Sequence, residues 1–516
     1  MTPFVDDEIV FTYNPNIGVD DIIAAGKKHH PEIDDTRIRH AFDFATAAHG
    51  DQKRKSGESY IHHPIATAFY LAQLKMDETT IIAGLLHDVP EDTAVTLEGI
   101  ETEFGEEVAF LVNGVTKLGQ LKYRGEERYV ENLRRMFMAM AQDARVIVVK
   151  FADRIHNLQT LSALPPEKQR RIALESLEIY APIANRLGMG EMKGVIEDLS
   201  FPFIYPEEYE WLTKQMDLQL KQKEEFIRDF VSFLEAEFKD RKIEYVSMHG
   251  RRKHLYSLYK KLIKNNRDTS KIYDMVAVRI IVPNIAKCYE TLGIIHEICK
   301  PLKGRIKDYI SQPKPNGYQS LHTTVFSPAR FATNEMYAEI AEIQIRTPEM
   351  HQEAEFGIAA HWQYKEKEQG SKKTDPRMNW MREVVELQKD ATDTHQLLET
   401  LKIDMFQNTI FVFTPKGAVI ELPEDASPVD FAYKIHTDLG DKCAGVKING
   451  QMSSLSDPLH SGDVVEILTN PQRKGPSAGW LSFVKTTNAR QSIRQYINKK
   501  NSSFFSRIGL SRNKED

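Results

Sequence analysis

The chain has 516 residues, enough for three or four domains that each bury a core of their own. Its 41% hydrophobic and 28% charged content is typical of globular proteins, and the net charge of −6 argues against wholesale coating of nucleic acid. The three cysteines, Cys288, Cys299 and Cys443, are far apart, which fits a reducing compartment and disfavours a disulfide framework or zinc knuckle. No signal peptide and no membrane-spanning apolar run is present, so the sequence predicts a cytoplasmic protein without a membrane partner.

The first domain is predicted to be all helical and to cover residues 1–200. Apolar side chains recur there every three to four residues, as in 65–74, and strand signals are few. A proline-punctuated junction at 201–206 ends this domain.

A second domain of mixed α/β character is predicted for residues 201–370. It begins with a helix over 217–239 that carries a Leu/Phe stripe, and continues with strands that alternate with helices. The predicted strands are 243–246, 272–282 and 338–346.

The remaining residues predict a connecting helix, a small β-rich module and a tail. Residues 371–404 form the connection, and residues 405–469 form the module. Its first and last strands are predicted at 409–413 and 464–468. A basic helical tail covers 470–516.

Two histidines and several carboxylates of the first domain are the residue types of a divalent metal site. His87 and Asp88 are adjacent and can serve one cation, while His63 and Asp153 would complete the pocket from other helices. Neutral imidazoles with carboxylates and no thiolate suit manganese, iron or zinc. A lone His-Asp doublet is more often a surface or capping pair, and His62 is an alternative to its neighbour. The coincidence of several such elements in order favours the metal site.

Glu91 and Asp92 lie four residues beyond that doublet, so a helix would place them on the same face. Pro90 predicts a kink or helix end there. Carboxylates beside a metal can orient or deprotonate an attacking water. Asn157 and Thr160 follow the aspartate of their helix by four and seven residues, so they extend one face of a lined pocket.

The second domain carries a second set of polar residues. Arg251 and Lys253 open a predicted helix, whose N-terminus would suit an anionic phosphate chain, although a solvated basic helix is the ordinary alternative. Asp274 interrupts an apolar strand, where a carboxylate is costly unless it is paired or metal-bound.

The strand at 338–346 places Glu342, Gln344 and Arg346 on one sheet face. This face resembles a site floor, and polar-out alternation on a half-exposed sheet is the alternative. After the Asn-Gly turn at 316–317, Tyr318 could stack on a base and His322 could meet a phosphate, although packing is their commoner role.

Taken in order, these motifs resemble the RelA/SpoT homologue family. Its hydrolase half is matched by Arg54-Lys55-Ser56-Gly57, His63-Pro64, His87-Asp88-x-x-Glu91-Asp92 and Asp153-Arg154-x-His156-Asn157. Its synthetase half is matched by Gly250-Arg251-x-Lys253-His254, Tyr273-Asp274, Arg305-x-Lys307-Asp308, Asn316-Gly317-Tyr318-Gln319-Ser320, Glu342-Ile343-Gln344-Ile345-Arg346 and Ala359-Ala360-His361-Trp362. The β-rich module resembles the TGS domain of long members. The family's zinc-finger-like and ACT regions would be expected after Asp516, so either this sequence is a fragment or its regulation differs from that of full-length relatives.

The resemblance implies a multidomain α and α+β fold. An all-helical HD-type hydrolase domain, a mixed α/β nucleotidyltransferase-like synthetase domain and a small β-grasp-like TGS domain would precede the helical tail. It also implies a bifunctional enzyme of the stringent response, favoured by the basic form of Arg305-x-Lys307-Asp308. Such an enzyme transfers pyrophosphate from ATP to the 3′-hydroxyl of GDP or GTP, and hydrolyses the product (p)ppGpp to GDP or GTP and pyrophosphate.

Two alternatives stay open. One is a hydrolase whose second domain only senses nucleotides. The other is a regulator that binds the ribosome, uncharged tRNA or acyl carrier protein through the TGS-like module, where Lys416 and His436 match positions near the tRNA 3′ end. A two-way enzyme would waste ATP if both sites ran together, so mutually exclusive states are expected, with the switch around 201–206 and the helix after it. The sequence predicts no particular oligomeric state.

The resemblance also implies roles for individual residues. In the hydrolase, the Mn²⁺ ligands would be His63, His87, Asp88 and Asp153, with Glu91 and Asp92 acting on water. The residues holding the substrate would be Arg54, Lys55, Tyr60, Asn157 and Thr160. In the synthetase, Asp274 and Glu342 would bind Mg²⁺, and Glu342 would deprotonate the 3′-hydroxyl. ATP would be bound by Arg251, Lys253, Ser257, Arg279, Arg305, Lys307 and Gln344. GDP or GTP would be bound by Lys314, Asn316, Tyr318, Gln319 and His322. Arg252 departs from the proline that relatives often carry.

Overall fold

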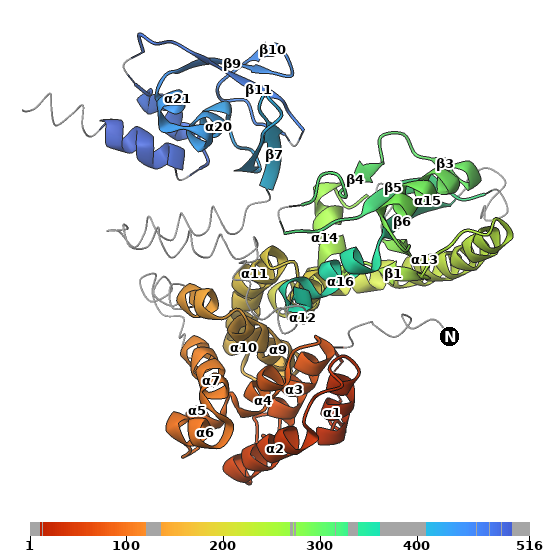
Figure 1. Cartoon of the computed structure of the whole chain (residues 1–516), viewed down its shortest axis with the longest axis vertical. Helices are drawn as coiled ribbons and strands as arrows, with labels where there is room; N and C mark the ends of the chain where they lie inside the picture. The colour runs from red at the N-terminus through yellow and green to blue at the C-terminus, as the bar shows by residue number, and fades with distance from the viewer. Residues whose placement is uncertain are drawn as a thin grey trace, which may run out of the picture. The chain divides into compact units, whose positions relative to one another are not determined.

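The computed structural model describes residues 11–12, 14–119, 136–268, 272, 275–314, 316–328, 339–361, 409–460, 462–473, 475–486 and 488–497 (Figure 1). The chain forms two compact units, Met1–Glu386 and Leu387–Asp516. Among the described residues, no helix is both long and apolar enough to cross a bilayer.

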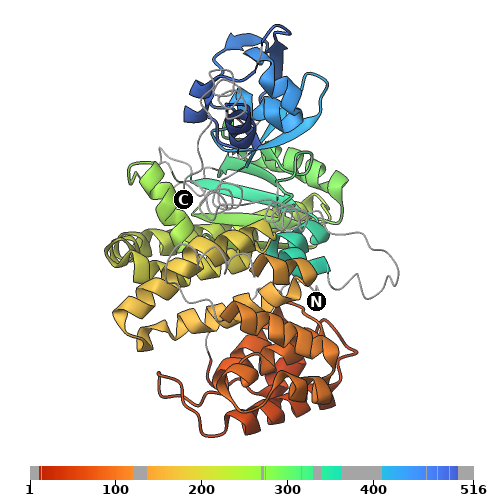
Figure 2. The same ribbon diagram turned by 90° about the vertical axis from the view of Figure 1, so that its left-hand side faces the viewer.

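The first part of the first unit consists of helices packed against one another (Figures 1 and 2), as the sequence predicts. Three of these helices, α2, α4 and α6, begin where Asp34, Asp77 and Thr96 accept hydrogen bonds from main-chain N–H groups of the first turn. The elements are α1 (Val19–Lys27), α2 (Asp35–His49), α3 (His62–Gln73), α4 (Glu78–Leu86), α5 (Val89–Asp92), α6 (Leu97–Phe104), α7 (Glu106–Gly119), α9 (Arg145–Gln159), η1 (Leu161–Ala163), α10 (Pro166–Glu175), the π-helical turn η2 (Ser176–Tyr180), α11 (Ala181–Arg186) and α12 (Gly190–Ile204).

Helices α3, α4 and α9 are the buried centre of this part. Every residue of α9 from Arg145 to Asp153 is buried, so the helix carries Asp153 into the interior. Helix α4 ends at Leu86, and Pro90 stands in the first turn of α5, where a proline has no intrahelical N–H partner to lose. The helix end expected near Pro90 is therefore confirmed.

The prolines of the junction at 201–206 interrupt the helices over only one residue, Tyr205. Helix α12 continues through Pro202, and α13 (Pro206–Asp240) begins directly after Tyr205. Pro206 occupies the first turn of α13, the helix position where proline is favoured. The predicted helix over 217–239 is thus the second part of a 35-residue helix.

The second part of the first unit is a mixed six-stranded sheet in the order β1-β2-β6-β5-β3, with β4 paired to β5. Strands β2 and β6 run parallel, and all other pairs are antiparallel. The elements are β1 (Ser247–Arg252), α14 (Leu255–Lys264), β2 (Val276–Ile281), α15 (Ile285–Ile298), β3 (Lys300–Pro301), β4 (Lys307–Asp308), β5 (Leu321–Phe326), β6 (Ile340–Arg346), α16 (Pro348–Phe356) and η5 (Gly357–His361). The predicted mixed α/β character is confirmed.

The two faces of this sheet differ in polarity. Ala341, Ile343 and Ile345 of β6 are buried in the core shared with α13 and α15. The alternate residues Glu342 and Gln344 face the other side, as a period of two requires. The register places Gln344 opposite Arg279 of β2 and His322 of β5, so one row of polar residues crosses three strands.

Two predictions for the start of this sheet are wrong. The strand expected at 243–246 lies at Ser247–Arg252, and Arg251 therefore belongs to a strand rather than to a helix N-terminus. The physical reason is pairing with β2, which sets Arg251 opposite Ala277. Helix α14 begins at Leu255, with His254 as its N-cap residue.

The second unit contains a small β-rich module, as predicted, which also includes helices that the sequence pattern did not predict. Its elements are β7 (Thr409–Phe413), β8 (Val419–Pro423), α20 (Pro428–Ile435), α21 (Thr437–Asp441), β9 (Cys443–Ile448), β10 (Gln451–Ser453), β11 (Val465–Thr469) and η7 (Ala478–Ser482). Strands β7 and β8 form a hairpin, and β10, β9 and β11 form a separate antiparallel sheet. A parallel bridge between Phe413 and Val464 joins the two.

The tail after 469 packs on this module and contributes to its core. Trp480, Val484, Ala489 and Ile493 are buried against Val429, Ala432 and Tyr433 of α20. The buried carboxylate of Asp430 ties the two segments together. It accepts a hydrogen bond from Ser427 N at 2.8 Å, and Asp430 N donates to Ser427 Oγ at 3.3 Å, which together form a capping box. The carboxylate also accepts from Ser427 Oγ at 2.7 Å. It also accepts from Lys485 N at 3.0 Å, Thr486 N at 2.7 Å and Thr486 Oγ1 at 2.8 Å.

Replacing this carboxylate should destabilise the second unit strongly. Asp430→Ala leaves buried N–H and O–H donors of both segments without their acceptor, at roughly 1–3 kcal/mol for each unsatisfied group. We expect the free energy of unfolding of the second unit to fall by about 3 kcal/mol or more, measured by urea denaturation of the whole chain. Asp438→Ala, at an exposed position of α21, is the matched control and should change it by less than about 1 kcal/mol. Equal stability of the two variants would contradict this account of the tail.

Candidate active sites

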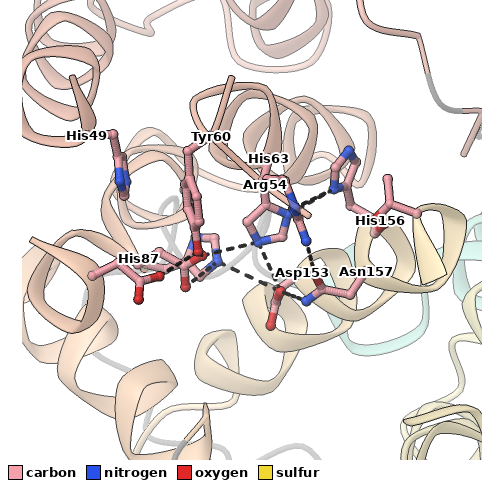
Figure 3. A network of polar contacts seen from close by, with 12 residues as sticks. His49, Arg54, Tyr60, His63, His87, Asp153, His156 and Asn157 are labelled. Carbon is pink, nitrogen blue, oxygen red and sulfur yellow. Dashed lines mark hydrogen bonds and ion pairs between the residues drawn. The ribbon is translucent and has the colours of Figure 1, made fainter. Parts of the chain in front are cut away.

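Three helical segments bring the predicted metal ligands of the first domain together (Figure 3). His63 comes from α3, His87 and Asp88 from the α4–α5 corner, and Asp153 from α9. One ligand atom each of His63, His87 and Asp88 lie within 4.8 Å of one another. Oδ1 of Asp153 lies 3.2 Å from Nε2 of His63 and 3.9 Å from Nε2 of His87. His62, the alternative ligand, is not in this cluster.

The chemistry of this cluster fits a divalent cation. Nδ1 of His87 lies 2.8 Å from the carbonyl oxygen of Gly84, so Nδ1 donates a hydrogen bond to that oxygen and Nε2 carries the free lone pair of the neutral ring. That Nε2 is buried and makes no hydrogen bond to any described residue. Two imidazole nitrogens and two carboxylates are a donor set for a borderline or hard cation, and the absence of thiolate disfavours a soft one.

Charge partners keep both carboxylates ionised. Burial opposes this, but Lys150, whose Nζ lies 2.6 Å from Oδ2 of Asp153, and the two histidines hold the pKa of Asp153 well below its usual range. The pKa of Asp88 is also lowered against burial, chiefly by His87 and His63. Anionic oxygens are therefore available to a cation at neutral pH.

Tyr60 and the acidic pair line the same site. The Tyr60 hydroxyl lies 2.9 Å from Oδ2 of Asp88 and 2.5 Å from Oδ2 of Asp92, and its ring stacks on His49 at 4.6 Å between centroids. Burial raises the pKa of Glu91 to about 7, with Lys150 opposing and neighbouring carboxylates reinforcing the shift. A carboxylate with a pKa near neutrality has the properties of a general acid or base.

The residues predicted to hold the substrate differ in their surroundings. Nη2 of Arg54 donates to Oδ1 of Asn157 at 2.5 Å, and the amide of Asn157 donates to Asp153. Thr160 is the C-cap residue of α9, and its hydroxyl donates to the main-chain oxygen of His156. Lys55 is exposed in the turn before α3. His156, to which the motif spacing assigned no role, is fully buried beside Arg54 and His63, and His49 also carries no sequence signal.

On the polar face of the sheet, side chains form a closed hydrogen-bonded ring. Glu342 Oε1 lies 3.2 Å from Nδ1 of His322 and accepts from Nε2 of Gln344 at 3.0 Å. Arg346 donates to Oε1 of Gln344 at 3.0 Å and to the Tyr318 hydroxyl at 2.8 Å. That hydroxyl and Nε2 of His322, 2.8 Å apart, complete the ring. The ring brings Glu342 close to two residues predicted to bind guanine nucleotide.

The other residues predicted to bind GDP or GTP frame the same face. Lys314 Nζ lies 5.1 Å from the centroid of the Tyr318 ring, and burial with Lys307 nearby lowers its pKa to about 8. Asn316 donates to the main-chain oxygen of Asn185, and Gln319 donates to that of Ile310. Both amides thus hold the loop that carries Tyr318.

Among the residues predicted to bind ATP, Arg279 and Arg251 are paired with carboxylates. Nη2 of Arg279 lies 2.9 Å from Oε1 of Glu355 on α16, and Nη2 of Arg251 donates to Oε2 of Glu191 on α12 at 2.9 Å. Ser257 donates to Glu197 at 3.3 Å. Lys307 lies on β4 opposite His322, and Arg305 and Lys253 lie in the segments before β4 and α14. Asp274, the other predicted Mg²⁺ ligand, lies outside the described residues.

Helix α12 thus contacts the start of α14 closely. His254 lies 3.0 Å from Oδ2 of Asp198 and 3.3 Å from Oε2 of Glu191. Gly194 permits this approach, because a Cβ there would lie 2.1 Å from the His254 ring. The carboxylates of Asp198 and Glu191 outweigh burial and raise the pKa of His254 from 6.5 to about 9.

This histidine should make the stability of the first unit depend on pH. Because the pKa of His254 is raised in the folded state, its contribution to the free energy of unfolding is complete below pH 6.5. This contribution is lost as pH rises through about 9. We expect the free energy of unfolding to fall by roughly 2–4 kcal/mol across that range, and His254→Gln to flatten this dependence. Urea denaturation at several pH values measures it. His460→Gln, at an exposed histidine of the second unit, should leave the pH dependence of the first unit unchanged. An unaltered slope in His254→Gln would contradict the assignment.

Comparison with known proteins matches three family models to these regions. The HD domain matches residues 41–190, the "Region found in RelA / SpoT proteins" matches 250–369, and the TGS domain matches 410–469. The chain is thus a protein in which an HD domain is followed by a RelA/SpoT region and a TGS domain. Both catalytic domain types imply the use of divalent metal.

Curated relatives match along about nine-tenths of the chain. A GTP pyrophosphokinase of Myxococcus xanthus is 47% identical over 91% of this chain and 61% of its own length. The guanosine-3′,5′-bis(diphosphate) 3′-pyrophosphohydrolase of Aquifex aeolicus is 47% identical over 91% of this chain and 66% of its own length. The bifunctional (p)ppGpp synthase/hydrolase SpoT of Escherichia coli is 45% identical over 90% of this chain and 65% of its own length. The chain belongs to the RelA/SpoT homologue family, and it spans less than two thirds of the length of these three relatives.

Solved structures match shorter segments. The small alarmone synthetase 2 of Bacillus subtilis is 26% identical, with a TM-score of 0.25, over 36% of this chain and 95% of that one. A metazoan SpoT orthologue that hydrolyses ppGpp is 27% identical, with a TM-score of 0.23, over 27% of this chain and 80% of that one.

Proposed function

We propose that this chain both makes and destroys (p)ppGpp, at two separate sites. The observation that carries the proposal is the presence of both constellations in one chain. A largely buried His-His-Asp-Asp cluster lies in the helical part, and a Glu342-centred polar ring lies on the sheet. The relatives' names, which include both pyrophosphokinase and pyrophosphohydrolase, support the same pair of activities.

In the hydrolase site, His63, His87, Asp88 and Asp153 would hold Mn²⁺. A divalent cation there would supply Lewis acidity and lower the pKa of water. Glu91 and Asp92 would orient the attacking water and take its proton, for which the pKa of Glu91 near 7 is suited. Arg54, Lys55 and Tyr60 would hold the guanosine end of the substrate, and Asn157 and Thr160 would line the sugar side. The products would be GDP or GTP and pyrophosphate.

In the synthetase site, Glu342 would accept the proton of the 3′-hydroxyl of GDP or GTP. The deprotonated oxygen would attack the β-phosphate of ATP, with AMP leaving, while Asp274 and Glu342 would hold Mg²⁺. Tyr318 would stack on guanine, with Lys314 and His322 near its phosphates. Arg251 would stack on the adenine of ATP. The ATP phosphates would be met by Lys253, Arg279, Arg305 and Lys307, and guanidinium groups suit this task because their N–H groups match phosphate oxygens.

The test is two assays on the purified chain. The first supplies ATP with GDP or GTP and Mg²⁺, and the second supplies ppGpp and Mn²⁺, with products separated by anion-exchange chromatography. We expect a 3′-pyrophosphorylated nucleotide in the first, and GDP with pyrophosphate in the second. Hydrolysis without synthesis would favour the alternative, a hydrolase with a nucleotide-sensing second domain. If neither assay yields its expected product, the proposal is refuted.

We further propose the TGS module as the binding surface for a ribosome-associated partner such as uncharged tRNA. Lys416 lies in the exposed turn between β7 and β8, and His436 lies exposed at the N-terminus of α21. Both side chains can therefore be reached by a partner. Ribosome co-sedimentation of the wild type and of a Lys416→Ala/His436→Ala variant tests this proposal, and equal binding of the two proteins would remove the module from it.

A further inference from the structure

His156 contacts both a predicted metal ligand and an arginine predicted to hold the substrate (Figure 3). Its side chain is fully buried. Its Nδ1 lies 2.9 Å from Nδ1 of His63 on α3 and 3.2 Å from Nη1 of Arg54 in the preceding turn. One ring nitrogen thus contacts both residues.

The direction of these hydrogen bonds follows from the donors and acceptors available. A guanidinium can only donate, so Nδ1 of His156 must accept from Arg54 and carries no proton itself. Two unprotonated nitrogens cannot form a hydrogen bond, so Nδ1 of His63 must carry the proton that it shares with His156. In neutral His63 this leaves the lone pair on Nε2.

That lone pair is on the side where the carboxylates lie. Nε2 of His63 is 3.3 Å from Oδ2 of Asp88 and 3.2 Å from Oδ1 of Asp153. The same task is performed for His87 by a main-chain group, the carbonyl oxygen of Gly84. Both histidines therefore present Nε2 to one point, but only His63 depends on a replaceable side chain for its orientation.

We propose that His156 is a positioning residue of the hydrolase site. Its Nδ1 accepts hydrogen bonds from His63 and Arg54, so that one imidazole selects the metal-binding tautomer of His63 and holds Arg54 beside the cluster. The part concerning Arg54 and the substrate rests on the proposed hydrolase function, whereas the part concerning the metal does not. Residues that orient metal ligands in this way affect metal affinity by about 10- to 100-fold.

The experiment compares Mn²⁺ affinity in three variants of the whole chain. His156→Leu removes the acceptor, His156→Asn keeps an oxygen near the position of Nδ1, and His156→Gln moves it toward the position of Nε2. Free Mn²⁺ is counted by electron paramagnetic resonance during titration, and thermal unfolding reports folding. We expect His156→Leu and His156→Gln to bind Mn²⁺ about 10- to 100-fold more weakly, and His156→Asn to stay within a few-fold of the wild type.

Leu158→Ala, at another buried position of α9, is the control. It should lower stability and leave Mn²⁺ affinity unchanged, which separates positioning from general packing. Wild-type affinity in folded His156→Leu, or equal weakening in the Asn and Gln variants, would overturn the proposal. If His156→Leu does not fold, the comparison of Asn with Gln decides it.

Hydrolysis of ppGpp supplies an independent readout for Arg54. His156→Leu should raise KM at saturating Mn²⁺, because Arg54 loses an acceptor, and His156→Asn should restore it. If the wild-type protein does not hydrolyse ppGpp, the proposed function is refuted. The metal-positioning role of His156 still holds in that case, provided that the wild type binds Mn²⁺ and the His156 variants weaken this binding as expected. An unchanged KM in His156→Leu would refute the role toward Arg54.

Discussion

Asp88→Ala should abolish Mn²⁺-dependent hydrolysis of ppGpp and leave synthesis of ppGpp intact. Asp88 lies within ligand distance of His63 and His87, and its Oδ2 also accepts from the Tyr60 hydroxyl. Because loss of a group that merely orients a ligand reduces activity by about 10- to 100-fold, we expect loss of a ligand itself to exceed about 100-fold. The measurement is the initial rate of ppGpp hydrolysis beside the initial rate of synthesis.

The matched control for this variant is Asp43→Ala, at an exposed position of α2. It should retain both rates. Full hydrolysis by Asp88→Ala would show that the metal assignment is wrong. Loss of both activities would indicate unfolding, which circular dichroism of the variant detects.

Glu342→Gln should have the opposite effect. The substitution keeps the size of the side chain on β6 and removes the carboxylate that faces His322. Loss of a general base costs about 10²- to 10⁴-fold in rate, and loss of a proposed Mg²⁺ ligand adds to this, so synthesis should fall by at least about 100-fold. Hydrolysis should stay at the wild-type rate, because its site lies on other elements. Synthesis is measured from ATP and GDP with Mg²⁺.

Glu349→Gln is the control for charge removal, since Glu349 is exposed in the first turn of α16. It should retain both activities. Undiminished synthesis by Glu342→Gln would exclude Glu342 from the chemistry and return the polar ring to a structural role.

Much of the helical site could be predicted from sequence because its members are close together or lie at helical spacing. His87 and Asp88 are neighbours, and Asp153 and Asn157 are one helical turn apart. What could not be predicted is which distant groups orient these residues. Lys150 beside Asp153 is a buried lysine among apolar residues, and only the packing of α9 shows that it faces the carboxylate.

On the sheet, the alternation of β6 predicted its polar face correctly, because a period of two does not depend on the neighbouring strands. The start of the sheet was predicted wrongly, since the basic segment around Arg251 has no alternation of its own. Its strand conformation depends on pairing with β2, which lies more than twenty residues further along the chain. Long-range pairing of this kind is not encoded in a local pattern.

The contacts of α12 with the synthetase residues have a thermodynamic consequence. Glu191 and Glu197 of α12 already accept hydrogen bonds from Arg251 and Ser257, two residues proposed to bind ATP. The helix would therefore compete with ATP for these two side chains. The apparent dissociation constant for ATP then equals the intrinsic constant divided by the fraction of molecules in which these contacts are open. For each tenfold decrease in that fraction, about 1.4 kcal/mol of nucleotide binding energy is used to displace the helix. If Arg251 and Ser257 bind ATP as proposed, ATP would favour the state in which their contacts with α12 are open. A ligand that holds these contacts closed would weaken ATP binding by the same coupling free energy.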